Sequence, residues 1–117
     1  MRSKSLDTFC PVGPVVVTTD ELPDAGDLAV RSWRNGELMQ ESRTSECVFD
    51  VPYLVAHCSQ AFTLEPGDII ATGTPGGIGY FRQPKISMRD GDVMAIEVEG
   101  IGRLTNPCRE VAARGSV

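Results

Sequence analysis

The chain has 117 residues, a formal net charge of −5 at pH 7 and 41% hydrophobic residues. This length allows one domain with a modest core, and the acidic balance argues against binding to a nucleic-acid backbone, which requires clustered lysine and arginine. No apolar run reaches the ~20 residues of a membrane span, and we expect no membrane partner. Four cysteines without a C-x-x-C spacing favour free thiols in a cytoplasmic protein.

The first half of the chain carries two kinds of strand signal. Residues 15–19 are β-branched and predict a strand. Further on, residues 28–34 and 37–43 flank Asn35-Gly36, a dipeptide that accepts the positive φ angles of a type I′ turn. The sequence therefore predicts a β-hairpin that turns at Asn35-Gly36.

The second half begins with a helical pattern and continues with strands. Asp50 can cap a helix, and apolar residues recur at helical spacing as far as Phe62. Residues 68–72 and 93–99 each follow a turn that contains glycine, and both predict strands. The expected fold is mainly β, a curled sheet or roll with one substantial helix. The tail at 112–117 is expected to be frayed.

A glycine-rich loop follows the strand predicted at 68–72. Residues 73–79 read Gly-Thr-Pro-Gly-Gly-Ile-Gly, so the backbone can approach a ligand closely and point several N–H groups at an anion. The loop lacks the Gly-Lys-Ser/Thr of a Walker A loop and the spacing of a dinucleotide fingerprint. Physical arguments alone leave two interpretations, a binding loop and a plain turn that needs positive φ angles.

Three other groups of polar residues could carry chemistry. Lys4 and Thr8 belong to a polar cluster that is either a solvated terminus or a place where a lysine stabilises negative charge. Glu97 and Glu99 share a strand face, which fits a cation site or, more simply, a solvent-exposed face. His57 is the only histidine and accompanies no nucleophile motif, so the sequence indicates no Ser-His-Asp or Cys-His site.

The order of these motifs resembles that of the fumarylacetoacetate hydrolase family. The run K-S-L-D-T-F-C-P at residues 4–11 resembles the family's lysine motif, and N-G-E-L-M-Q-E-S-R-T at 35–44 resembles its hairpin motif. The run T-L-E-P-G-D-I-I-A-T-G-T-P-G-G-I-G at 63–79 resembles its glycine-loop signature. With the final strands included, the resemblance spans roughly residues 3–108.

This resemblance implies a β-rich roll that acts on small keto or dicarboxylic acids with a divalent cation, Mg²⁺ or Mn²⁺. The main implied reaction is hydrolysis of a C–C bond in an acylpyruvate or fumarylacetoacetate. Isomerisation or decarboxylation of hydroxymuconate-type diacids, or decarboxylation of oxaloacetate, is the alternative. Carried over by motif, Lys4 is the active-site lysine, Thr8 lies beside it, and Gly73 and Thr74 bind a substrate carboxylate or keto oxygen.

One part of the family's pattern has no counterpart in this sequence. The family holds its cation on a Glu-x-Glu pair and a later aspartate, all upstream of the lysine motif, and no Glu-x-Glu precedes Lys4. We therefore expect residues 1–117 to form the C-terminal part of the catalytic domain, to lack the metal ligands and to be inactive alone. The expected macromolecular partner is a second copy, as a homodimer, or a complementing N-terminal half. A non-catalytic remnant is the remaining alternative.

Overall fold

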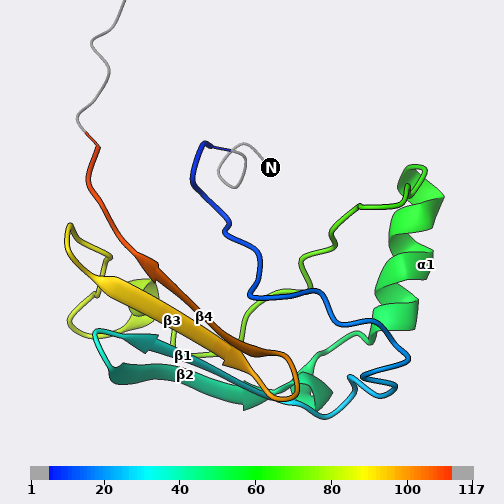
Figure 1. Cartoon of the computed structure of the whole chain (residues 1–117), viewed down its shortest axis with the longest axis horizontal. Helices are drawn as coiled ribbons and strands as arrows, with labels where there is room; N and C mark the ends of the chain where they lie inside the picture. The colour runs from blue at the N-terminus through cyan, green and yellow to red at the C-terminus, as the bar shows by residue number, and fades with distance from the viewer. Residues whose placement is uncertain (1–5, 112–117) are drawn as a thin grey trace, which may run out of the picture.

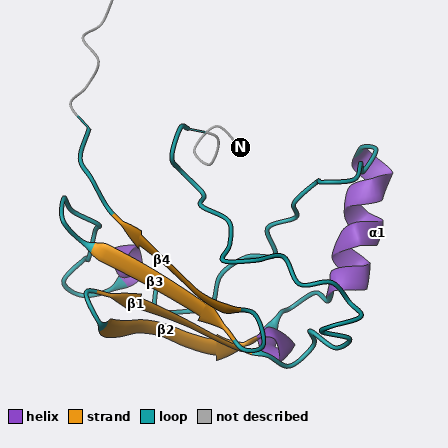
Figure 2. Ribbon diagram, in the orientation of Figure 1, coloured by secondary structure: helices purple, strands orange, loops and turns teal. Residues whose placement is uncertain are grey.

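A computed structural model describes residues 6–111 of the chain. In this part, four antiparallel strands form a sheet in the order β2-β1-β3-β4 (Figure 1). The strands are β1 (Ala29–Arg34), β2 (Glu37–Arg43), β3 (Val93–Val98) and β4 (Gly102–Pro107). The helix α1 (Val51–Ala61) stands beside the sheet, and 3₁₀ turns lie at Thr44–Glu46 and Gly79–Phe81 (Figure 2). The expected strand-rich architecture with one substantial helix is confirmed.

The hairpin forms where it was predicted because its turn residues adopt left-handed backbone angles. Asn35 and Gly36 have φ angles of 52° and 84°, the two positive values of a type I′ turn. The side chain of Asn35 also ties the turn to the next strand, because its Oδ1 accepts from the N–H of Val93 at 2.8 Å. The turn is therefore fixed both by its own backbone and by the start of β3.

A bulge interrupts the pairing of β1 with β2. Ser32 pairs with Gln40 and Trp33 pairs with Leu38, so Met39 has no partner in β1. A bulge bends its strand and changes the direction of the neighbouring side chains. In this chain it lies where the glycine loop contacts β2, because Gln40 donates to Thr74 of the loop and the Met39 carbonyl oxygen accepts from Arg82 just beyond it.

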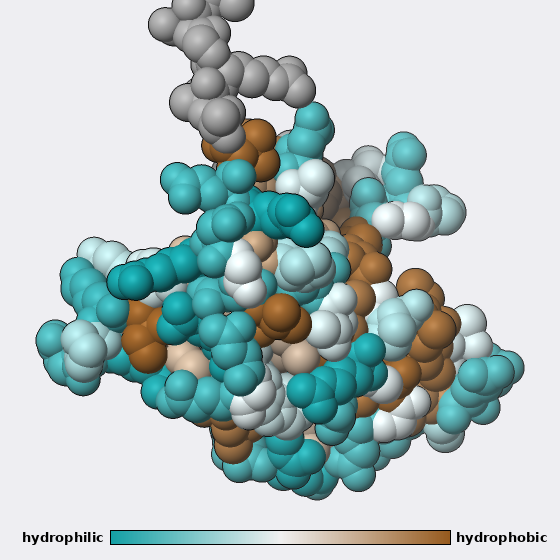
Figure 3. All heavy atoms as spheres, turned by 60° about the vertical axis from the view of Figure 1, so that its left-hand side comes forward, coloured by the Kyte–Doolittle hydropathy of each residue, from teal (hydrophilic) through white to brown (hydrophobic). Residues whose placement is uncertain are grey.

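The core of the described part is small. Its buried apolar residues are Leu28, Ala29, Met39 and Ala95, and no large side chain of residues 6–111 is fully buried. Apolar side chains instead reach the surface at several places between polar ones (Figure 3). The sheet is thus held together mainly by its backbone ladders and by polar contacts at its ends.

The helix is capped as predicted, but it buries less apolar surface than the spacing of its apolar residues suggests. The carboxylate of Asp50 accepts from the N–H of Tyr53 at 2.8 Å and so satisfies one free donor of the first turn. Within α1 only Leu54 and Cys58 are half-buried, and Phe62, just beyond its end, is exposed. The predicted apolar face is therefore reduced to one narrow stripe.

Two predicted strands are absent from the described structure. Residues 15–19 and 68–72 have no regular secondary structure, and Val16 and Ile69 are 85% and 73% exposed. A β-branched run becomes a strand only where another strand offers its edge, and neither segment pairs with the sheet. The prediction of these two strands was wrong because composition indicates an extended chain but not a partner for it.

Candidate functional site

The side chain of Gln40 connects β2 to the glycine loop. Its Nε2 donates to the hydroxyl of Thr74 at 3.0 Å and to the carbonyl oxygen of Pro75 at 2.9 Å, with a longer contact of 3.4 Å to that of Gly76. Its Oε1 accepts from the hydroxyl of Ser32 at 3.0 Å. Ser32 is buried in β1, and its hydroxyl holds the Oε1 of Gln40 towards the sheet. The NH₂ group of Gln40 is therefore directed at the loop.

Arg82 fastens the other end of the same loop. Its Nε donates to the carbonyl oxygen of Gly77 at 3.1 Å, and its guanidinium also donates to the carbonyl oxygen of Met39 at the bulge. Gly77 has a φ angle of +96°, and a Cβ added there would lie 2.7 Å from that Met39 oxygen. Only glycine fits this position, because a side chain would clash with β2 and strain the backbone.

The backbone N–H groups of the loop have no acceptor within the described part of the chain. The amides of Gly73, Thr74, Gly76 and Gly77 donate to no residue of 6–111, whereas the carbonyl oxygens of residues 75–77 accept from Gln40 and Arg82. The loop thus has carbonyl oxygens held by Gln40 and Arg82, and N–H groups without an acceptor among the described residues. Free donors on a fixed, glycine-rich backbone are the arrangement that binds anionic oxygens.

A cavity of about 300 Å³ opens beside the loop. This volume is at the lower end of the range for small-molecule sites. Its wall includes Thr72–Pro75, the end of β2 with the segment that follows it to Phe49, and Leu54 of α1. Gly73 and Thr74, both predicted to bind substrate, therefore face a common space. Thr8 is not among the lining residues, and Lys4 lies outside the described residues.

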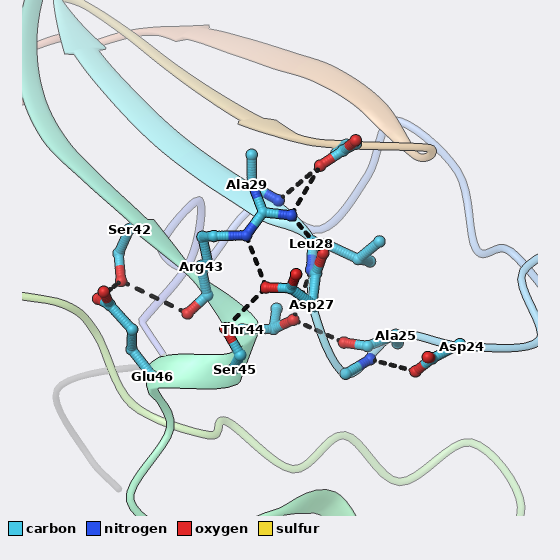
Figure 4. A network of polar contacts seen from close by, with 12 residues as sticks. Asp24, Ala25, Asp27, Leu28, Ala29, Ser42, Arg43, Thr44, Ser45 and Glu46 are labelled. Carbon is cyan, nitrogen blue, oxygen red and sulfur yellow. Dashed lines mark hydrogen bonds and ion pairs between the residues drawn. The ribbon is translucent and has the colours of Figure 1, made fainter.

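A polar network holds the wall of the cavity that β2 provides (Figure 4). Arg43 Nε donates to the carboxylate of Asp27 at 2.6 Å, and its Nη2 lies 3.7 Å from the carboxylate of Glu99. The guanidinium of Arg43 and the hydroxyl of Ser45 hold the pKa of Asp27 below its usual range. Arg43 is thus paired with two carboxylates and does not present a free positive charge to the cavity.

Thr44 joins the end of β2 to the entry of β1 in the same network. Its hydroxyl accepts from the N–H of Leu28 at 2.8 Å and donates to the carbonyl oxygen of Ala25 at 2.6 Å (Figure 4). Its own N–H donates to the carbonyl oxygen of Leu28 at 2.9 Å. A hydroxyl is needed here because it must donate and accept at once.

Glu97 and Glu99 are both engaged in structural contacts. Glu97 lies 4.0 Å from Arg103, and Glu99 accepts from the N–H of Ala29 at 2.9 Å. No group of three or more His, Cys, Asp or Glu side chains comes together within residues 6–111. Mg²⁺ and Mn²⁺ need a set of oxygen ligands, so the described residues by themselves do not fit such a cation.

Asp92 is a buried carboxylate that the sequence did not single out. It accepts from Arg34 Nε at 2.8 Å, from Asn35 Nδ2 at 2.8 Å and from the N–H of Arg89 at 2.7 Å. These donors, Arg34 first, lower the pKa of Asp92 to about 2. Asp92 thereby connects the hairpin turn to the turn before β3. Its role is structural, and it does not belong to the glycine loop.

The residues that hold the glycine loop were also missed as functional residues. In the sequence Gln40 is only one residue of the hairpin motif at 35–44, and Arg82 belongs to no motif. The one signal for Gln40 is its position. In a regular hairpin, the number of residues between the Asn35-Gly36 turn and Gln40 decides which face of the strand Gln40 occupies. Its contact with the loop depends on the bulge at Met39, which no pattern in the sequence indicates.

Comparisons with known proteins identify the family of the chain. The sequence profile described as fumarylacetoacetate (FAA) hydrolase C-terminal matches residues 1–109. The mitochondrial oxaloacetate tautomerase fahd2 of Xenopus laevis is 44% identical over 107 residues, which are 92% of this chain and 34% of that protein. The chain thus spans about a third of the curated relatives that it matches.

Two solved structures show the same architecture. The fumarylacetoacetate hydrolase of Exiguobacterium antarcticum superposes with a TM-score of 0.87 at 46% identity, covering 92% of this chain and 39% of that one. The maleylpyruvate hydrolase of Sphingobium sp. SYK-6, in complex with manganese(II) and pyruvate, gives a TM-score of 0.77 at 40% identity and covers 86% and 36%. The chain therefore belongs to the fumarylacetoacetate hydrolase family.

Proposed function

We propose that this chain forms the keto-acid-binding part of a metal-dependent enzyme that hydrolyses a C–C bond in a small dicarbonyl acid. The observation that carries the proposal is the arrangement of the glycine loop, whose carbonyl oxygens accept from Gln40 and Arg82 while its N–H groups have no acceptor among residues 6–111. Donors fixed in advance stabilise the negative charge that develops on a substrate oxygen during bond cleavage.

In this proposal Gly73 and Thr74 bind a carboxylate or keto oxygen through backbone N–H groups and the hydroxyl. Lys4 acts near the same oxygens, with Thr8 beside it. The manganese(II) and pyruvate of the Sphingobium relative support this assignment, because pyruvate combines the two oxygen types that the loop would bind. The relatives extend well beyond the segment matched here, and we assign the ligands of the divalent cation, Mg²⁺ or Mn²⁺, to that additional portion of the fold.

Isomerisation is the alternative reaction at the same site. The relatives include an oxaloacetate tautomerase as well as hydrolases, and tautomerisation, isomerisation and C–C hydrolysis can all pass through an enol or enolate of a keto acid. The loop would serve any of them equally, because it binds the oxygen on which charge develops. Decarboxylation of oxaloacetate or of a hydroxymuconate-type diacid follows the same logic.

A second candidate function, that of a subunit completing a site shared with another chain, is favoured by the small core. Described side chains such as Val16, Val48 and Phe81 are 85%, 88% and 77% exposed, and apolar surface of this kind favours association. We propose a homodimer or a complex with a complementing N-terminal half. A monodisperse monomer in sedimentation velocity at micromolar concentration would contradict both forms of association.

The cellular compartment is a further part of the proposal. Among residues 6–111, no helix combines the length and the apolar character needed to cross a bilayer. The four cysteines are free thiols, which suits a reducing compartment, and we propose the cytoplasm. The Xenopus relative is named as mitochondrial, so fractionation of cells that produce the protein distinguishes the two compartments.

The proposed function is tested with Lys4→Ala and Thr74→Ala in the active enzyme that contains this chain. We expect each substitution to lower the turnover of acetylpyruvate by a hundredfold or more, because one fixed donor contributes about 10²–10³ in rate. Lys85→Ala and Thr19→Ala are the matched controls, since both remove the same side chains from exposed positions. Full activity in both Lys4→Ala and Thr74→Ala would refute the assignment.

A further inference from the structure

The contact between Gln40 and Thr74 has a fixed direction. A side-chain NH₂ group only donates, whereas a hydroxyl donates one hydrogen and accepts on its lone pairs. Gln40 Nε2 lies 3.0 Å from Thr74 Oγ1, so Gln40 donates and Thr74 accepts. The hydroxyl hydrogen of Thr74 is not used in this contact, and it donates to no other group of residues 6–111.

The orientation of the Gln40 amide is set by its other partners. Ser32 donates to Oε1 at 3.0 Å, and the carbonyl oxygen of Pro75 accepts from Nε2 at 2.9 Å. A flipped amide would place Oε1 against the carbonyl oxygens of Pro75 and Gly76, where acceptors would face acceptors. The buried hydroxyl of Ser32 and the loop carbonyls therefore keep the NH₂ group directed at Thr74.

From this we infer that Gln40 is a positioning residue that reserves the hydroxyl hydrogen of Thr74 for the substrate. The inference rests on the proposed function, in which Thr74 binds a substrate oxygen. It adds that Thr74 acts there as a donor, so the ligand group must be an acceptor such as a carboxylate, a keto oxygen or an enolate. Gln40 occupies one of the two lone pairs of Thr74 Oγ1 and leaves its only hydrogen available, which favours a ligand that offers an acceptor.

Two substitutions at this position separate positioning from simple support of the loop. Gln40→Glu keeps the size of the side chain but replaces its donor with an acceptor, which draws the hydroxyl hydrogen of Thr74 away from the substrate. We expect kcat to fall by about 10²–10³, as after loss of a donor in Thr74→Val. Gln40→Met removes the donor without adding an acceptor, leaves that hydrogen free, and should lower kcat no more than about tenfold.

The pH profile provides a readout that a purely structural role would not change. In Gln40→Glu the new carboxyl faces the oxygens of Thr74, Pro75 and Gly76, which favour its protonated form and raise its pKa above the ordinary value of about 4.3. A protonated carboxyl can donate to Thr74 again. The activity of this variant relative to the parent should therefore recover as the pH falls from 7 towards about 5, and Gln40→Met should show no such recovery.

The test measures kcat and KM for acetylpyruvate from pH 5 to 8 in the active enzyme that contains this chain, for the parent, Gln40→Glu, Gln40→Met and Thr74→Val. Equal activity of the two Gln40 variants at every pH, with Thr74→Val impaired, would overturn the inference and leave the proposed function standing. An unimpaired Thr74→Val would refute the part of the proposed function in which the Thr74 hydroxyl binds substrate.

Discussion

Replacing Gly77 with alanine tests how the glycine loop is seated on β2. The φ angle of +96° costs an L-residue about 1–2 kcal/mol. The new Cβ would also lie 2.7 Å from the carbonyl oxygen of Met39, closer than van der Waals contact allows. If the loop stays in place, strain and overlap together lower the free energy of unfolding by about 2–4 kcal/mol. If it lifts away, the lost hydrogen bonds from Gln40 and Arg82 contribute about 0.5–1.5 kcal/mol each.

The neighbouring Gly76 provides the matched control. A Cβ at Gly76 meets nothing within 4 Å, and its φ lies outside the left-handed range. Gly76→Ala should therefore be neutral or stabilise the chain by about 0.4–1 kcal/mol through the unfolded state. Urea denaturation compares the two variants. Equal unfolding free energies for Gly77→Ala and Gly76→Ala would refute the described seating of the loop.

Three further predictions concern the frame of the site and its metal. The donors to Asp92, Arg34 first, lower its pKa from 3.8 to about 2, so this carboxylate stabilises the fold fully above about pH 4 and the contribution is lost as the pH falls towards 2. Urea denaturation between pH 2 and 7 should show this dependence in the parent and a weaker one in Asp92→Asn, and identical profiles would contradict it. Thr44→Val leaves the N–H of Leu28 without its acceptor and should lower the unfolding free energy by about 1–2 kcal/mol, whereas Thr19→Val, at an exposed turn, should not. Calorimetric titration of this chain with Mn²⁺ should show only weak binding, and tight stoichiometric binding would mean that acids within the chain form a metal site.

Local signals predicted the elements whose causes are local. The Asn35-Gly36 turn fixes the hairpin through two residues, and Asp50 with the apolar spacing after it fixes the position of α1. The segments 15–19 and 68–72 failed as strands because a strand also needs a partner. Nothing within those five-residue runs indicates whether another strand will pair with them.

The candidate site was predictable only in outline. The composition of residues 73–79 indicated a backbone that can bind an anion, and the resemblance assigned Gly73 and Thr74 to it. Gln40 reaches the loop from β2 through side-chain contacts 34 or more residues apart along the chain. Arg82 contacts Gly77, 5 residues away, and joins it to Met39 at the bulge, 43 residues away. Such contacts are set by tertiary structure, which explains why Gln40 and Arg82 carried no recognisable signal.

The account depends most on the claim that the free N–H groups of the glycine loop bind a keto acid. A titration with pyruvate, followed in ¹H–¹⁵N spectra of this chain, tests that claim directly. Saturable shifts concentrated at the amides of Gly73, Thr74, Gly76 and Gly77 are the predicted result, and Gly77→Ala should weaken them. Unchanged loop amides at millimolar pyruvate, or shifts confined to the Arg43 end of the cavity, would contradict the claim.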